Sequence, residues 1–235
     1  MKGCYMRDTL KDKEWFDNRV TFLAGYIERI KEDLANGPFT TQRIEGLRGL
    51  LHHAEFDILE ARYSRGDQVS ELAAPFSKLI LDYVEDFVPE WYTDSLWLLS
   101  IGVMLEVDDE AFNTLANTVI EQCEEDWLYN YLIHSRLPEV GFEESPLLWN
   151  RPYQVLKQVV EEADDKPAAM QRYLKRSWYR SHSSAGWYDS HKSKFDIYTG
   201  YWSYESGAVA KILGLDDSSL EGLQYYPYDL VHYKA

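Results

Sequence analysis

Three side chains in the last quarter of the chain, His182, Asp189 and His191, carry groups that can perform acid–base chemistry. A histidine titrates near neutral pH and a carboxylate can orient it, so a hydrolytic site could be built from them. No nucleophile and no third metal ligand stands at a recognisable spacing. Two interpretations remain: a metal-dependent hydrolase that uses these three residues or, as we expect, polar groups that hydrogen-bond helix ends and fix a turn around Gly186.

A second polar cluster has the spacing of a helix face: His52 and His53, followed by Glu55, Asp57 and Glu60. A metal site in a helical bundle is typically built from Glu-x-x-His repeats together with further carboxylates. The sequence contains no Glu-x-x-His segment. We therefore interpret this cluster as exposed helix polarity and expect neither a metal nor any other cofactor.

Apolar residues recur at spacings of three and four, the period of an amphipathic helix, and no run of alternating strand residues occurs. The pattern predicts helices over about 15–34, 44–61, 69–87, 91–106, 108–123, 126–137, 152–163, 167–182 and 201–213. We expect an all-α protein, a multi-helix array that is orthogonal or bundle-like. Its N-terminal helical part, residues 1–125, and its C-terminal helical part, residues 126–235, are expected to share a core.

The net charge of −16 is confined to the middle third of the chain. Residues 67–150 hold 18 acidic residues against Lys78 and Arg136, whereas the segments before and after are each neutral. Direct binding of DNA or RNA is disfavoured because phosphate contacts need lysine and arginine. Concentrated negative charge instead raises the association rate of basic partners.

A basic protein partner is therefore expected to bind in the middle third. Two groups of acidic residues are the candidate contacts, one before a predicted helix and one in the loop over residues 138–152: Glu121, Glu124, Glu125 and Asp126, and Glu139, Glu143 and Glu144. The run Asp108-Asp109-Glu110 ranks lower because it is typical of a helix start.

The two cysteines, Cys4 and Cys123, suggest no disulfide framework, and the N-terminus has no apolar run of signal-peptide length. The longest apolar stretch, Leu96–Leu105, is half of the ~20 residues that a membrane helix needs. We expect a cytoplasmic protein that does not bind membranes.

The C-terminal segment carries four distinctive pieces, three of them rich in aromatic residues: Trp187–Lys192, Gly200–Glu205, Ala208–Leu220 and Tyr225–Leu230. Together they resemble the C-terminal signature of PoNi proteins, the immunity proteins against PoNe-type DNase toxins of bacterial competition systems. Two upstream pieces, Ser95–Ser100 and Leu105–Phe112, are also similar to that family. The resemblance implies a non-catalytic immunity protein that binds a cognate basic DNase toxin stoichiometrically. A helical adaptor without a toxin partner remains an alternative.

The aromatic-rich segment is expected to be structural before it is functional, because buried tryptophan and tyrosine fill cores while keeping one polar atom. The residues assigned this role are Trp187, Tyr188, Asp189, His191, Tyr201, Trp202 and Glu205. Glu205 would be buried and would need a partner. The candidates to pair with it are the bases of one helical stripe, Arg172, Lys175, Arg176 and Arg180.

Overall fold

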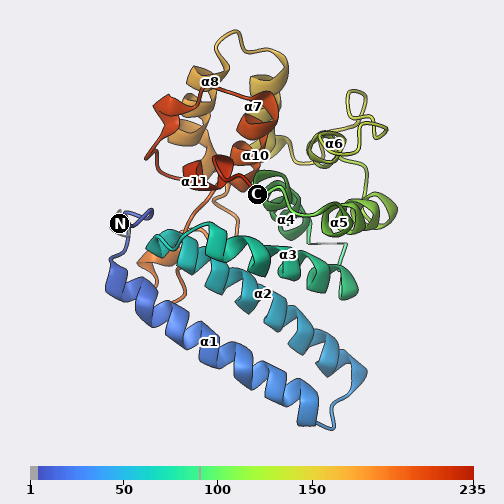
Figure 1. The fold of residues 1–235 in the computed structure, drawn as a ribbon, viewed down its shortest axis with the longest axis vertical. Coiled ribbons are helices and arrows are strands. Elements are labelled where there is room, and N and C mark those ends of the chain that lie inside the picture. Colours follow the sequence, from blue (N-terminus) through green and yellow to red (C-terminus); the bar gives the residue numbers. More distant parts are fainter. Residues whose placement is uncertain (1–4, 90) are drawn as a thin grey trace. The chain divides into compact units, whose positions relative to one another are not determined.

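The computed structural model describes residues 5–89 and 91–235, and within them the chain is all-α, as predicted (Figure 1). Cys4, one of the two cysteines, lies outside the described residues. No helix of the described part is long and apolar enough to cross a membrane. The longer helices are α1 (Lys13–Asn36), α2 (Thr41–Arg65), α3 (Ser70–Glu85), α4 (Tyr92–Met104), α5 (Asp109–Gln122), α6 (Trp127–His134), α7 (Asn150–Glu161), α8 (Lys166–Tyr173) and α10 (Tyr204–Leu213).

Packing divides the chain into two compact units, each built from two separate pieces. Unit 1 comprises Met1–Phe87 and Asp189–Gly200, and unit 2 comprises Val88–Tyr188 and Tyr201–Ala235. The division of the sequence into residues 1–125 and 126–235 stays a prediction.

Unit 1 is organised around α1 and α2, which lie side by side and run in opposite directions (Figure 1). Asp12 starts α1 by accepting a hydrogen bond from the amide of Trp15 at 2.9 Å. Leu23 and Ile27 of α1 pack against Ala54 of α2 to form the core between them. These are positions of the three-and-four pattern, so the sequence period directly produces the buried face.

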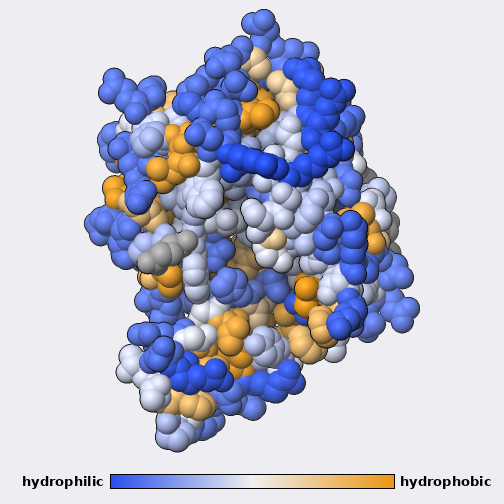
Figure 2. Space-filling model, turned by 180° about the vertical axis from the view of Figure 1, so that it is seen from behind, coloured by the Kyte–Doolittle hydropathy of each residue, from blue (hydrophilic) through white to orange (hydrophobic). Residues whose placement is uncertain are grey.

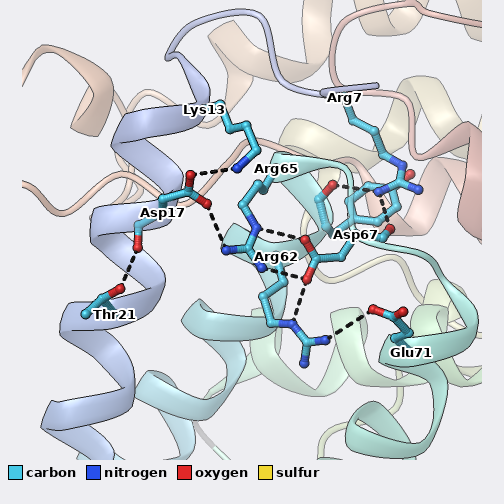
Figure 3. A network of polar contacts seen from close by, with 9 residues as sticks. Arg7, Lys13, Asp17, Thr21, Arg62, Arg65, Asp67 and Glu71 are labelled. Carbon is cyan, nitrogen blue, oxygen red and sulfur yellow. Dashed lines mark hydrogen bonds and ion pairs between the residues drawn. The ribbon is translucent and has the colours of Figure 1, made fainter. Parts of the chain in front are cut away.

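The end of α2 is fixed by a network of ion pairs and hydrogen bonds (Figure 3). Arg65 donates to Asp17 of α1 at 3.0 Å and to Asp67 at 2.8 Å, and Arg62 donates to Asp67 at 2.9 Å. Although burial opposes it, the hydrogen bonds from Arg65 and Arg62 hold the pKa of Asp67 below its usual range. Gly66 has a φ of 101°, a conformation that favours glycine, so the chain can turn here without strain.

A short C-terminal segment, Asp189–Gly200, completes unit 1 through hydrogen bonds to residues far away in the sequence. The Trp15 indole donates to the carbonyl of Tyr198 at 3.1 Å, and the Tyr198 hydroxyl donates to Asp8 at 2.5 Å. The Thr199 hydroxyl donates to Glu60 at 2.5 Å. This segment of the chain therefore contacts the helical hairpin at the other end of the sequence through hydrogen bonds to Trp15 and Glu60. Glu60 and His52 are buried, so the interpretation of their cluster as exposed helix polarity is wrong for these two residues.

Unit 2 is built around α4, which packs on α10 and is apolar on most sides. Gly207 of α10 allows the close approach, because a Cβ there would lie 2.5 Å from Met104 Sδ and 2.6 Å from Pro227 Cγ. At the end of α4, the ammonium of Lys211 donates to the carbonyl of Met104 at 2.6 Å. The predicted buried helix over about 91–106 is therefore confirmed.

Candidate functional site

Six of the seven acidic residues predicted to contact a partner are exposed, and all lie in unit 2. Three surround the end of α5 and the turn into α6, and three lie in the loop between α6 and α7: Glu121, Glu124 and Glu125, then Glu139, Glu143 and Glu144. We call these six glutamates the acidic surface. None of them forms an ion pair with another described residue, so their charge is not neutralised locally.

The α6–α7 loop is tied to the start of α6 at several points. The hydroxyl of Ser145 donates to Glu125 at 2.8 Å, and the amide of Trp127 donates to the carbonyl of Pro146 at 2.7 Å. Phe142 packs edge-on against the ring of Tyr131, with centroids 5.2 Å apart. Glutamates about twenty residues apart in the sequence are thereby held on adjoining segments.

Asp126 corrects one of the sequence predictions, because its side chain is fully buried and cannot contact a partner. Its carboxylate caps α6 by accepting from the amides of Leu128 and Tyr129 at 2.9 and 3.1 Å. It also accepts from the amide of Leu148 at 2.9 Å and from the hydroxyl of Tyr92 at 3.0 Å. Because this one carboxylate accepts four hydrogen bonds, it connects the start of the helix to the loop and has a structural role.

Backbone hydrogen bonds favour the charged form of one acid in the loop. Hydrogen bonds from the amides of Glu143 and Phe142 lower the pKa of the Glu143 carboxyl. Elsewhere in unit 2, acids of the middle third are neutralised: Asp109 pairs with Arg136 at 2.5 Å and Glu106 with Lys211 at 3.0 Å. Asp108 caps α5 by accepting from the amide of Ala111 at 2.9 Å, as predicted. Two acids of the middle third outside the acidic surface are therefore paired with a base, and a third caps a helix.

Two apolar side chains at the end of the same loop were missed by the sequence analysis. Leu148 is 40% exposed and Trp149 is 53% exposed. Figure 2 shows several patches of hydrophobic residues separated by hydrophilic residues. An exposed apolar side chain by itself therefore does not indicate a binding site, and its neighbours must be considered. Here the amide of Leu148 donates to the buried carboxylate of Asp126, and the exposed Trp149 is of a residue type that is enriched at binding hot spots. The run Leu147-Leu148-Trp149 inside a polar, proline-rich loop was the sequence pattern that could have revealed it.

The aromatic residues of the C-terminal signature lie mainly inside unit 2. Trp202 is 5% exposed and Tyr201 is 4% exposed. Trp187 stacks on Trp178 with ring centroids 5.6 Å apart, and Tyr188 stacks on Tyr179 at 4.5 Å. These contacts agree with a structural role, which stays a prediction for each residue.

Glu205 is fully buried, and its predicted partner is wrong. Its Oε1 accepts from Trp178 Nε1 at 2.6 Å and from the Ser203 hydroxyl at 2.7 Å, while its Oε2 has no hydrogen-bond partner. The four bases of the stripe are all exposed instead. Without a cation, burial raises the pKa of Glu205 to about 7, against the hydrogen bonds that lower it.

The residues of the hydrolase hypothesis are divided between the units. His182 lies in unit 2, where its Nδ1 is 2.8 Å from the carbonyl of Trp178 and burial lowers its pKa to about 4. Asp189 and His191 lie in unit 1, and Asp189 pairs with Lys192 at 2.9 Å. Asp189 has a φ of 60°, which fits its predicted role in a turn. Among the described residues, no group of three His, Cys, Asp or Glu side chains is placed to hold a metal ion.

Two family models match this chain, one over its N-terminal half and one over its C-terminal half. A family model described as "PoNe immunity protein (PoNi), N-terminal" matches residues 7–117, and one described as "PoNe immunity proteins (PoNi), C-terminal" matches residues 124–230. No curated protein matches the chain. The crystal structure of protein PA2201 from Pseudomonas aeruginosa is similar, with a TM-score of 0.75 and 23% sequence identity. That likeness covers 99% of this chain and 91% of the other, and it shows a shared fold.

Proposed function

Because the chain belongs to the family of PoNe immunity proteins (PoNi), we propose that it neutralises a cognate PoNe-type DNase toxin by binding it stoichiometrically. The observation that carries the mode of binding is the acidic surface, six exposed glutamates that form no ion pair with another described residue and lie on segments joined by the hydrogen bond from Ser145 to Glu125. No catalytic step and no cofactor are part of the proposal.

The chemistry of the partner explains why an acidic surface would be effective. An enzyme that cleaves DNA must contact phosphates through lysine and arginine, so its DNA-binding face is basic. Glutamates that carry no compensating cation offer that face the same charge as a phosphate backbone. Occupation of the basic face would then exclude DNA from the toxin.

Charge complementarity mainly increases the association rate and contributes less to the affinity. The exposed Trp149 and Leu148, in the same loop as three of the six glutamates, supply the apolar contact that long residence needs, since a few aromatic anchors carry most of the energy of an interface. We therefore assign Trp149 as the anchor and the glutamates as its charged surroundings.

The proposal is tested by co-expression with a catalytically inactive form of the nuclease encoded by an adjacent gene. A complex of defined stoichiometry that protects plasmid DNA from the active nuclease supports it. Trp149→Ala should weaken the complex by at least about tenfold, the loss expected for a hot-spot residue. A folded protein that fails to bind the nuclease, or that binds it without protecting DNA, contradicts the proposal.

A matched control variant distinguishes an effect of the acidic surface from an effect of the net charge of the protein. Glu28 and Glu32 of α1 are exposed acids outside the middle third. The double variant Glu28→Lys/Glu32→Lys changes the net charge by as much as Glu124→Lys/Glu144→Lys does. Only the second double variant should impair protection.

A further inference from the structure

A pocket of about 430 Å³ in unit 2 is lined by bases, although the chain as a whole is strongly acidic. One wall is the helical segment after α8, and the other is the loop before the short helix α11 (Tyr228–Val231): Leu174, Lys175, Arg176, Tyr179 and Arg180, facing Leu223, Gln224 and Tyr225. The volume is within the range of pockets that bind small molecules.

The bases around this pocket are not neutralised by neighbouring acids. Residues 166–188 contain five bases and no acidic residue. Lys175, Arg176 and Arg180 are exposed and form no ion pair with another described residue, and no acidic side chain lines the pocket. A further guanidinium lies beside it, since Arg151 donates to the carbonyl of Arg180 at 3.2 Å.

The helical wall departs from α-helical geometry at these residues. Leu174–Trp178 form a π-helical turn, in which hydrogen bonds join residues five apart. In an α-helix, residues five apart point in directions about 140° apart. The π turn changes this angle, and Lys175 and Arg180, which lies in the following short helix Tyr179–Ser181, both line the pocket. Single π turns are frequent at functional sites.

The opposite wall carries a second unusual backbone conformation. Tyr225 has a φ of 75°, which costs free energy in a bulky residue and is concentrated at ligand-binding and active sites. Its ring stacks on Tyr179, with centroids 5.2 Å apart and an interplanar angle of 5°. Tyr188 stacks on Tyr179 as well, at 4.5 Å. Because these rings are stacked on one another, the pocket offers charge rather than a free aromatic face to a ligand.

We propose that this pocket binds a small organic phosphate. Two arginines and one lysine at one mouth fit a doubly charged phosphate ester, because guanidinium groups donate paired hydrogen bonds to its oxygens. The negative field of the whole chain opposes anions at long range, but at physiological salt it is screened beyond about 8 Å. The local bases then dominate, and the volume beyond the phosphate holds the organic part.

Calorimetric titration of the full chain with ribose 5-phosphate tests the proposal, with ribose as the uncharged control. We expect saturable one-to-one binding of the phosphate ester and none of ribose. Arg176→Gln and Arg180→Gln should each lower the affinity by about tenfold, as the loss of a charge-assisted hydrogen bond predicts.

Arg172→Gln is the matched control, because Arg172 is an exposed base of the same stripe that does not line the pocket. It should leave the affinity within about twofold, and all three variants should keep the parent melting temperature, since their side chains are exposed. Equal losses in all three variants would show a diffuse charge effect and overturn the proposal. Absence of saturable binding, or tighter binding of a tetraglutamate peptide, would overturn it too.

Discussion

The indole of Trp178 donates a 2.6 Å hydrogen bond to a carboxylate, Glu205, that no described cation neutralises. Both side chains are buried in unit 2, and the second carboxylate oxygen has no hydrogen-bond partner. The charged form of Glu205 is therefore poorly solvated, which is why its pKa rises to about 7 from a usual 4.5. The hydrogen bond between Trp178 and Glu205 connects the helical segment after α8 to α10. The free-energy cost of burying Glu205 depends on pH, because only the charged form of its carboxyl is poorly solvated.

Replacement of Glu205 by glutamine should remove that pH dependence. A raised folded-state pKa contributes stability that is fully present below the unfolded pKa of 4.5 and is lost as pH rises through about 7. Above that pH, Glu205→Gln should be more stable than the parent protein by up to about 3 kcal/mol, whereas the two should be equal in acid. Urea unfolding from pH 4 to pH 8 measures the difference.

The contribution of His182 to stability has the opposite pH dependence, so it must be distinguished from that of Glu205. Its folded pKa of about 4, below the usual 6.5, contributes stability that is present above 6.5 and is lost as pH falls through 4. The difference between Glu205→Gln and the parent cancels that contribution because both contain His182. A difference that did not change with pH would refute the assignment to Glu205.

Asp126→Ala should destabilise the protein by at least about 3 kcal/mol, because four donors would lose their buried acceptor. It should also release the α6–α7 loop, since the contact with the amide of Leu148 is lost. Limited proteolysis should then cut the loop sooner than in the parent. Asp126→Asn, which keeps one acceptor oxygen, should be intermediate; unchanged stability and cleavage in Asp126→Ala would contradict the structural role.

Two tryptophans should behave in opposite ways. Trp202 is 5% exposed, so Trp202→Ala should cost about 3–5 kcal/mol and lower the melting temperature. Trp149 is 53% exposed, so Trp149→Ala should leave the melting temperature nearly unchanged and weaken the toxin complex. If Trp202→Ala kept its stability but lost toxin binding, Trp202 would be an interface residue instead.

Local features of the fold were predictable from the sequence because they depend on neighbours in the chain. The three-and-four spacing identified the helices, and the acidic run at Asp108 identified a cap that the structure contains. The capping role of Asp126 was indicated by its place before α6, but its burial was not, because Asp108 caps α5 and is exposed. Asp126 was predicted to contact the partner because its charge was given more weight than its capping role.

Features that depend on residues distant in the sequence were not predictable. Charge complementarity suggested a basic partner for Glu205, but the structure provides an indole and a hydroxyl. The pairing of Thr199 with Glu60 joins residues 139 positions apart. The exposure of Trp149 likewise depends on how the loop is tied to α6. In each case tertiary packing determined the surroundings of the side chain.

The central claim, that the acidic surface receives a basic toxin, is tested most directly by association rates over a range of salt concentrations. In the parent protein the rate should fall steeply as salt rises, because steering by exposed charges is screened. Glu124→Lys/Glu144→Lys should slow association at low salt and flatten the salt dependence, while the control Glu28→Lys/Glu32→Lys should match the parent. If the first pair of substitutions left both rate and salt dependence untouched, and Arg176→Gln or Arg180→Gln abolished association, the acidic surface would not be the binding site.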